Sequence, residues 1–153
     1  MPEGANALDL GHFLRTSGRW NRPDEYGCLY TSLTRDGAIA ELTKLLRRYE
    51  LTGQEYGPRE LVDVRVSVVP VVPVISEEVH QRLGLDPAKL IGDTPEDIEY
   101  CRAVADLLRA QGCRAILSPS AALVGAANLN IYIEGPSANL SLSPGGHREP
   151  VVL

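Results

Sequence analysis

The stretch Thr16–Leu42 reads TSGRWNRPDEYGCLYTSLTRDGAIAEL, and it contains the features that decide the fold. It starts as a polar turn, continues as the run GCLYTS at residues 27–32, which predicts a short strand, and leads into a helix. The chain has only eight aromatic residues, and four of them lie between Phe13 and Tyr30 beside arginines. A functional hypothesis has to explain why flat rings and guanidinium groups gather in this segment.

The helix that follows has a broad apolar stripe, and Thr34 or Asp36 can cap its first turn. We expect it to end near Leu51–Gly53. Glu41 lies at the margin of the stripe, where its carboxylate would be partly removed from water. The alternative is a solvated pair between Glu41 and Lys44, three residues further on. The stripe consists of Ala38, Ile39, Leu42, Leu45, Leu46 and Tyr49.

The middle of the chain predicts strands. Between Val62 and Val68, valines alternate with polar residues, which is typical of a strand with one buried and one wet face. The continuation to Ser76 contains two prolines, which cannot donate to a strand ladder, so we expect it at a sheet edge or outside the sheet. A short helix that Ser76 caps should then reach Leu83.

The clearest helix signal is Thr94–Asp97, which supplies a cap, a proline at the first helical position and acids at the positive helix end. Gly112 should close this helix. Strands at 114–117 and 129–133 flank a turn-rich segment. Because strands and helices mix without regular βαβ alternation, we predict a single α+β domain over residues 1–134. Residues 135–153, rich in Gly, Pro and Ser, predict a loosely attached tail.

Composition and charge restrict the classes of function. The 153 residues suffice for one domain, and 44% hydrophobic with 23% charged residues excludes a disordered chain and a membrane span. A net charge of −5 argues against a nucleic-acid-binding surface. No signal peptide or anchor can be recognised, so we expect a cytoplasmic protein that acts on a small molecule or a protein.

Several common sites are not predicted. Cys28, Cys101 and Cys113 lack the spacing of a disulfide framework or a zinc site, and the three histidines have no metal spacing. The glycine motifs of dinucleotide-binding folds and P-loops and the hydrolase nucleophile motif are missing from the sequence. We therefore predict no metal site.

Four motifs follow one another along the chain: GRWN at 18–21, CLYTSL at 28–33, A-x-x-E at 38–41 and ILSPSAA at 116–122. In this order they resemble a known family, the RES domain. This family is named for arginine, glutamate and serine positions, and it supplies the toxin of bacterial RES–Xre toxin–antitoxin pairs. The resemblance covers roughly residues 9–133 and implies an α+β fold similar to ADP-ribosyltransferase toxins.

The resemblance also implies a reaction. NAD⁺ would be the substrate, with no resident cofactor, and the nicotinamide–ribose bond would be cleaved with water, phosphate or a protein as acceptor. It further implies an Xre-type helix-turn-helix antitoxin as partner, without direct contact to nucleic acid or a membrane. Assembly into oligomers with the antitoxin is compatible with this interpretation.

The resemblance implies roles for the individual residues that match the family's motifs. Arg19 matches the family's arginine, whose planar fork suits a pyrophosphate, and Trp20 beside it is a further substrate-binding candidate. The alternative is an exposed loop arginine next to a core tryptophan. Tyr30 would place its ring against the nicotinamide with its hydroxyl free, or it is a core tyrosine. Glu41 would stabilise the oxocarbenium-like sugar or hold the ribose hydroxyls.

Ser120 matches the family's serine and would hydrogen-bond the carboxamide or a ribose; a turn or helix cap is its alternative role. Asn128 is a candidate for a nearby polar contact. One departure concerns a further arginine that family members carry about twenty residues before GRWN. In this sequence that place falls before Met1, and Arg15 does not match it. A second interpretation is therefore a non-catalytic RES-fold module that acts through protein–protein interaction.

Overall fold

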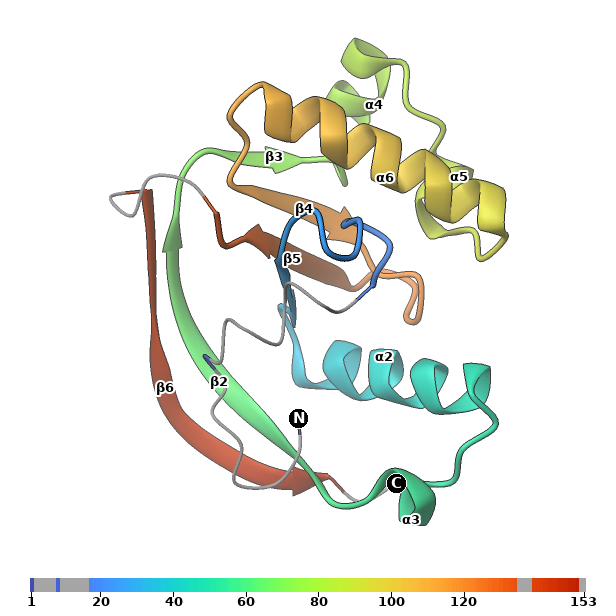
Figure 1. Cartoon of the computed structure of the whole chain (residues 1–153), viewed down its shortest axis with the longest axis vertical. Coiled ribbons are helices and arrows are strands. Elements are labelled where there is room, and N and C mark those ends of the chain that lie inside the picture. The colour runs from blue at the N-terminus through green and yellow to red at the C-terminus, as the bar shows by residue number, and fades with distance from the viewer. Residues whose placement is uncertain (2–7, 9–16, 135–138, 152–153) are drawn as a thin grey trace.

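The computed structural model describes residues 1, 8, 17–134 and 139–151. It contains a four-stranded sheet with the order β1-β5-β4-β3 and a separate two-stranded sheet of β2 and β6, with helices on one side (Figure 1). This mixture confirms the predicted α+β class. In the described part of the chain, no helix is long and apolar enough to cross a membrane. The elements are β1 Cys28–Ser32, α2 Arg35–Arg48, α3 Gly53–Tyr56, β2 Arg59–Val68, β3 Val71–Pro73, α4 Glu77–Leu83, α5 Pro87–Ile91, α6 Pro95–Ala110, β4 Ala115–Pro119, β5 Ala127–Tyr132 and β6 Leu140–Val151.

The two long helices begin where their capping residues predict. Thr94 accepts a hydrogen bond from the backbone of Asp97, whose carboxylate accepts one from the backbone of Thr94, and this capping box starts α6. Thr34 caps α2 by accepting from the backbone N–H of Gly37. Helix α2 ends at Arg48, earlier than predicted, because Glu50 has a positive φ of 53° that breaks the helix.

The strand predictions hold, and the proline-rich continuation is an edge strand. β3 pairs with β4 in parallel and has no further neighbour among the described strands. No strand on its outer side therefore needs a backbone hydrogen bond that a proline cannot donate. Two short helices were not predicted, α3 and α5. Each begins at a capping residue, Thr52 and Asp86 respectively, and each is too short to show an apolar period.

The prediction of a loosely attached C-terminal tail is wrong for residues 140–151. They form β6, which pairs antiparallel with β2 along its length. Leu140 and Leu142 pack against the apolar face of the four-stranded sheet. The Gly, Pro and Ser content of this segment is untypical of a strand and concealed it. Pro144 is nevertheless compatible with the strand, because it lies beside the register shift between Val62 and Val64, where a bulge accommodates it. The rest of the proposed tail that the structure describes is Asn139, whose carbonyl accepts a hydrogen bond from Val69.

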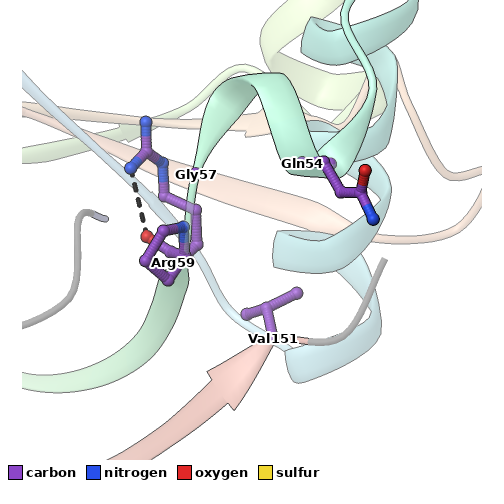
Figure 2. A pocket seen from close by; sticks show the side chains of 6 residues that line it. Gln54, Gly57, Arg59 and Val151 are labelled. Carbon is purple, nitrogen blue, oxygen red and sulfur yellow. Dashed lines mark hydrogen bonds between the residues drawn. The ribbon is translucent and has the colours of Figure 1, made fainter.

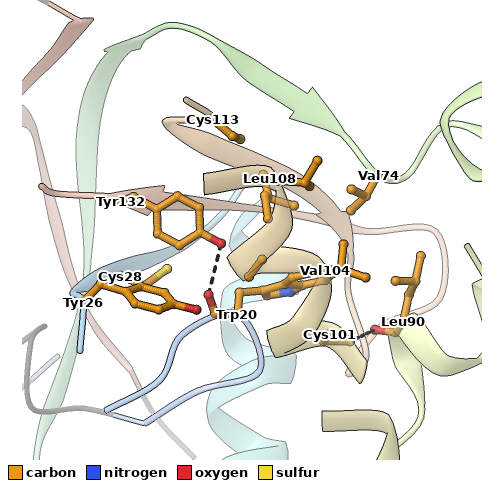
Figure 3. Packing of buried hydrophobic residues seen from close by; sticks show 12 residues of the cluster. Trp20, Tyr26, Cys28, Val74, Leu90, Cys101, Val104, Leu108, Cys113 and Tyr132 are labelled. Atoms are coloured by element: carbon orange, nitrogen blue, oxygen red, sulfur yellow. Dashed lines mark hydrogen bonds between the residues drawn. The ribbon is translucent and has the colours of Figure 1, made fainter. Parts of the chain in front are cut away.

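The four-stranded sheet has two unlike faces, because residues paired across strands share a face. Leu29, Ile131 and Ala115 form one row, and this face is covered by the β2–β6 ribbon. The opposite face looks toward α2, α5 and α6 (Figure 1). At one end it carries Tyr132, which packs with Trp20 and the helices in the main hydrophobic core (Figure 3).

The aromatic and arginine-rich segment largely fastens α6 to the sheet. The Arg22 guanidinium pairs with Glu99 at 2.6 Å and with Asp106 at 2.7 Å, both on α6. Tyr26 donates its hydroxyl to Asp106 at 2.7 Å, and its ring packs edge-on against Tyr132. The gathering of rings and guanidinium groups therefore has a structural explanation at these residues. Phe13 and Arg15 lie outside the described residues.

Candidate functional site

The polar end of the helix-facing sheet surface forms the candidate site. Strand pairing aligns Ser32, Asn128 and Ser118 in one row across β1, β5 and β4. The next row holds Tyr30 and Asn130, together with the apolar Ile116 of β4. Polar side chains thus replace the apolar ones that cover the same face at its other end. In this polar patch Ser118 and Asn130 are 1% exposed, whereas Ser32 and Asn128 are partly exposed.

Glu41 reaches this patch from α2. Its Oε1 accepts hydrogen bonds from Ser120 Oγ and from Asn128 Nδ2, each at 2.7 Å. Three predicted site residues, widely separated in sequence, are therefore in direct contact. Glu41 is partly exposed, and Oε2 makes no hydrogen bond to any described residue. One carboxylate oxygen is fixed, and the other has no hydrogen bond to a described residue.

Lys44 does not form the predicted alternative pair with Glu41. Its ammonium lies 2.7 Å from Asp93 Oδ2 and donates to the carbonyl of Ala121 at 2.7 Å. Within the described part of the chain, no ion pair joins Lys44 to Glu41. The Glu41 carboxylate is held by neutral donors, so its negative charge is not cancelled by a neighbouring cation in contact.

Ser120 both closes a turn and orients Glu41. Its Oγ accepts from the backbone N–H groups of Ala122 and Leu123 at 3.1 Å each. Since these two bonds use the lone pairs of the hydroxyl oxygen, the hydroxyl proton is directed to Glu41. Ser120 is 6% exposed. The turn role and the functional role therefore coexist.

Four buried side-chain polar atoms have no hydrogen-bond partner among the described residues; one is Arg114 Nε, and the other three lie on the polar end of this sheet face. Asn128 Oδ1, Asn130 Oδ1 and Ser32 Oγ are buried without a hydrogen-bond partner among the described residues. Leaving such a group unpaired costs about 1–3 kcal/mol, so native proteins keep few of them. Their concentration beside Glu41 indicates a surface prepared for water or for a polar ligand.

Tyr30 combines an accessible ring with an internal hydroxyl. The residue is 39% exposed, yet its hydroxyl accepts from the Trp20 backbone N–H at 2.8 Å and donates to Asn21 Oδ1 at 2.9 Å. Burial of the hydroxyl raises the pKa of Tyr30 well above its ordinary value. The expectation of a free hydroxyl is wrong, because both of its hydrogen-bonding directions are used. A side chain on Gly18 would collide with this phenol.

Arg19 and Trp20 do not contact Glu41. Arg19 Nη1 donates to the carbonyl of Gly92 at 2.6 Å, and Nη2 pairs with Asp93 Oδ1 at 3.0 Å. The Arg19 side chain is 12% exposed, so it is not the exposed loop arginine of the alternative interpretation. Trp20 is 2% exposed within the core, so packing accounts for its ring and we leave it out of the proposed site.

Asp93 connects Arg19 to α2. Its carboxylate contacts Lys44, Arg19 and also Arg48, at 3.3 Å. Partial burial alone would raise the pKa of Asp93, but the Lys44 hydrogen bond and the charges of Lys44, Arg19 and Arg48 outweigh it and lower the pKa. Asp93 is thus an ionised carboxylate within a cluster of three cations, which we call the cationic cluster.

Sequence reasoning missed Asn130, Ser118 and Asp93. The alternation Asn-Leu-Asn at 128–130 carried a usable signal, because it places Asn130 on the same face as Asn128. Asn130 Nδ2 donates to Ser118 Oγ at 2.8 Å, which links β5 to β4. For Asp93 no local pattern existed, since its partners come from two distant segments, the loop at Arg19 and helix α2.

A pocket of about 290 Å³ lies elsewhere, at the end of the β2–β6 ribbon beside α3 (Figure 2). Arg59 within it donates to the Pro58 carbonyl at 3.2 Å. None of the residues described above for the Glu41 site lines it. Its lining residues are Gly53, Gln54, Gly57, Pro58, Arg59 and Val151.

A family model of the RES domain matches residues 4–152. The chain belongs to the RES domain family. The match extends past the end of the motif-based resemblance and includes β6, so this RES domain comprises both sheets. Arg19, Glu41 and Ser120 are the residues that we aligned with the arginine, glutamate and serine of the family name.

Among solved structures, this RES domain is similar to a chain in the crystal structure of the M. tuberculosis MbcT–MbcA toxin–antitoxin complex. The TM-score is 0.77 at 17% sequence identity, over 99% of this chain and 80% of the other. At this identity the likeness establishes a shared fold. No curated protein sequence matches the chain.

Proposed function

We propose that this RES domain cleaves the nicotinamide–ribose bond of NAD⁺. The observation that carries the proposal is Glu41, a partly exposed residue whose carboxylate has one oxygen fixed by Ser120 and Asn128 and the other without a hydrogen bond to a described residue. Cleavage of this bond makes the ribose oxocarbenium-like and releases neutral nicotinamide. A fixed, uncompensated carboxylate stabilises such developing positive charge, as in glycoside cleavage.

The neighbours of Glu41 have separate roles in this mechanism. Ser120 and Asn128 hold the carboxylate in one orientation, so that no reorganisation is needed as charge develops. The exposed ring of Tyr30 is on the same sheet face, one row away from Asn128, and we assign it to stacking on the nicotinamide. Water, phosphate or a protein nucleophile would then form the new bond to the ribose carbon and lose its proton to solvent.

We place this activity in a cytoplasmic toxin that an Xre-type antitoxin neutralises. Membership of the RES family supports a toxin, and a structural neighbour that was crystallised as a toxin–antitoxin complex supports an antitoxin partner. A non-catalytic interaction module is the second candidate. The observation that favours it is that Asp93 forms ion pairs with both Arg19 and Arg48, so these two guanidinium groups are already engaged and would have to exchange partners to bind a pyrophosphate.

Nicotinamide release from NAD⁺ tests the proposal. The purified chain is assayed with and without phosphate, beside Glu41→Gln and a matched control, Glu78→Gln, which makes the same change on an exposed turn of α4. We expect Glu41→Gln to lower the rate by at least about 100-fold and the control to retain it. Phosphate dependence would identify the acceptor. Absence of release by folded wild-type protein at high concentration would favour the interaction module.

A further inference from the structure

Helix α2 presents a charged line that begins at Glu41. Lys44 and Arg48 follow at three and seven residues, so all three side chains share one face of the helix. Each helical turn advances about 5.4 Å, which places Lys44 roughly one turn and Arg48 roughly two turns from the carboxylate. Arg19 is connected to Lys44 and Arg48 through Asp93, which contacts all three side chains.

Asp93 is the only carboxylate that pairs with the cationic cluster among the described residues. Three cations therefore surround one negative charge, which leaves an excess of two positive charges. Asp93 lies in the short connection between α5 and α6, and its side chain is 49% exposed. Such a carboxylate is accessible from solvent, and its pair with Arg48, in which both side chains are about half exposed, is weak and exchangeable for another anion.

The shape of the cluster matches an anion with several oxygens. Asp93 Oδ1 contacts Arg19 and Arg48, while Oδ2 contacts Lys44. A phosphate group offers more acceptor oxygens and more charge to the same donors, and arginine forks bind it bidentately. The second phosphate of a diphosphate would use the remaining positive charge.

We infer that Asp93 is an internal competitor that occupies the diphosphate position of a nucleotide, and that Lys44, Arg48 and Arg19 bind this diphosphate once Asp93 leaves. The inference rests on the proposed function for the identity of the nucleotide. Binding exchanges the Asp93 carboxylate for phosphate oxygens and releases the α5–α6 connection from α2. The distance along α2 suits a dinucleotide, since its diphosphate is one sugar away from the bond at Glu41.

Calorimetric binding of inorganic pyrophosphate and of ADP-ribose tests the competitor role without relying on catalysis. Wild-type protein is compared with Asp93→Asn and Asp93→Ala, and with Glu96→Gln as a control that removes an exposed charge from the first turn of α6. We expect the Asp93 variants to bind both probes about tenfold more tightly, and the control to match wild type. Unchanged or weaker binding by folded Asp93 variants would overturn the inference.

The role of the cationic cluster in binding is tested by the variants Lys44→Gln and Arg48→Gln. Each should weaken pyrophosphate binding about tenfold and raise the KM for NAD⁺ with little change in kcat. Arg47→Gln is the matched control, because Arg47 is an exposed neighbour on α2 without a side-chain contact to the cationic cluster. Thermal melting verifies that each variant is folded.

The two proposals fail separately. If wild-type protein releases nicotinamide but the Asp93 variants have unaltered pyrophosphate binding and KM, the competitor role is wrong and the enzyme assignment stands. If no variant releases nicotinamide while Asp93→Asn tightens pyrophosphate binding, the NAD⁺ activity is wrong and the anion exchange at Asp93 stands.

Discussion

Ser120 and Glu41 are 79 positions apart in the sequence and are joined by a 2.7 Å hydrogen bond from the serine hydroxyl to the carboxylate. The same hydroxyl accepts two backbone N–H groups of its own turn. The orientation of the carboxylate on α2 is therefore tied to the shape of the loop after β4. A change in the conformation of that loop is therefore expected to change the orientation of the Glu41 carboxylate.

Ser120→Ala should lower kcat for nicotinamide release about tenfold with little effect on KM, because the carboxylate loses one of its two positioning donors. The unfolding free energy should fall by about 1–2 kcal/mol, because the turn loses its acceptor. Steady-state kinetics and urea unfolding measure the two effects. Ser143→Ala, on exposed β6, is the control. Equal kcat for both variants would contradict the positioning role.

Asn128→Asp would place a second carboxylate against Glu41 Oε1. Two carboxylates in contact share a proton, which raises the pKa of the pair. Activity should therefore drop sharply near neutral pH and recover partly as the pH rises and the pair loses its proton. A pH–rate profile measures this, with Asn139→Asp as a control outside the site. An unshifted profile would show that Asn128 does not govern the charge of Glu41.

Tyr30→Phe keeps the ring and removes the hydroxyl. The Trp20 N–H and Asn21 Oδ1 would each lose a partner, so the unfolding free energy should fall by about 1–3 kcal/mol. The folded variant should keep most of its nicotinamide release, because stacking uses the ring alone. Urea unfolding and kinetics below the transition measure both, and Tyr49→Phe, 63% exposed, is the control. A large kcat loss without destabilisation would assign the hydroxyl to catalysis.

The protein should lose stability at alkaline pH. Burial raises the pKa of Cys28, Tyr26 and Tyr132 above the ordinary values of about 8.5 for cysteine and 10 for tyrosine. These groups stay neutral in the folded state while the unfolded chain ionises. Their stabilisation is thus complete below about pH 8.5 and is lost as the pH rises further. Melting temperatures from pH 7 to 11 test this, and a constant value above pH 9 would contradict it.

The features that could be predicted from sequence are local ones. α6 follows from a cap, a proline and acids within Thr94–Asp97, and β2 follows from the alternation of its valines. Glu41 was singled out partly by its place at the edge of an apolar stripe, which depends only on neighbours along α2. The RES resemblance added Ser120, whose motif by itself indicates a turn.

The features that were missed depend on partners far away in the sequence. Nothing near Asp93 indicates that Arg19 and Lys44 will meet it. The engagement of the Tyr30 hydroxyl depends on how Gly18 and Trp20 fold back over β1. β6 lacks a strong strand composition and is stabilised by β2, its ladder partner, so propensity alone underestimates it.

The pairing of β2 with β6 also constrains how the protein is made. Arg59 pairs with Val151 and Val68 with Leu140, so this ribbon closes very long chain loops. High contact order slows folding, because loop-closure entropy is lost before the contacts form. During synthesis, the apolar face with Leu29 and Ile131 lacks the part of its cover that Leu140 and Leu142 supply until β6 leaves the ribosome. Nascent chains interrupted before that point would be targets for chaperones and proteases rather than folded domains.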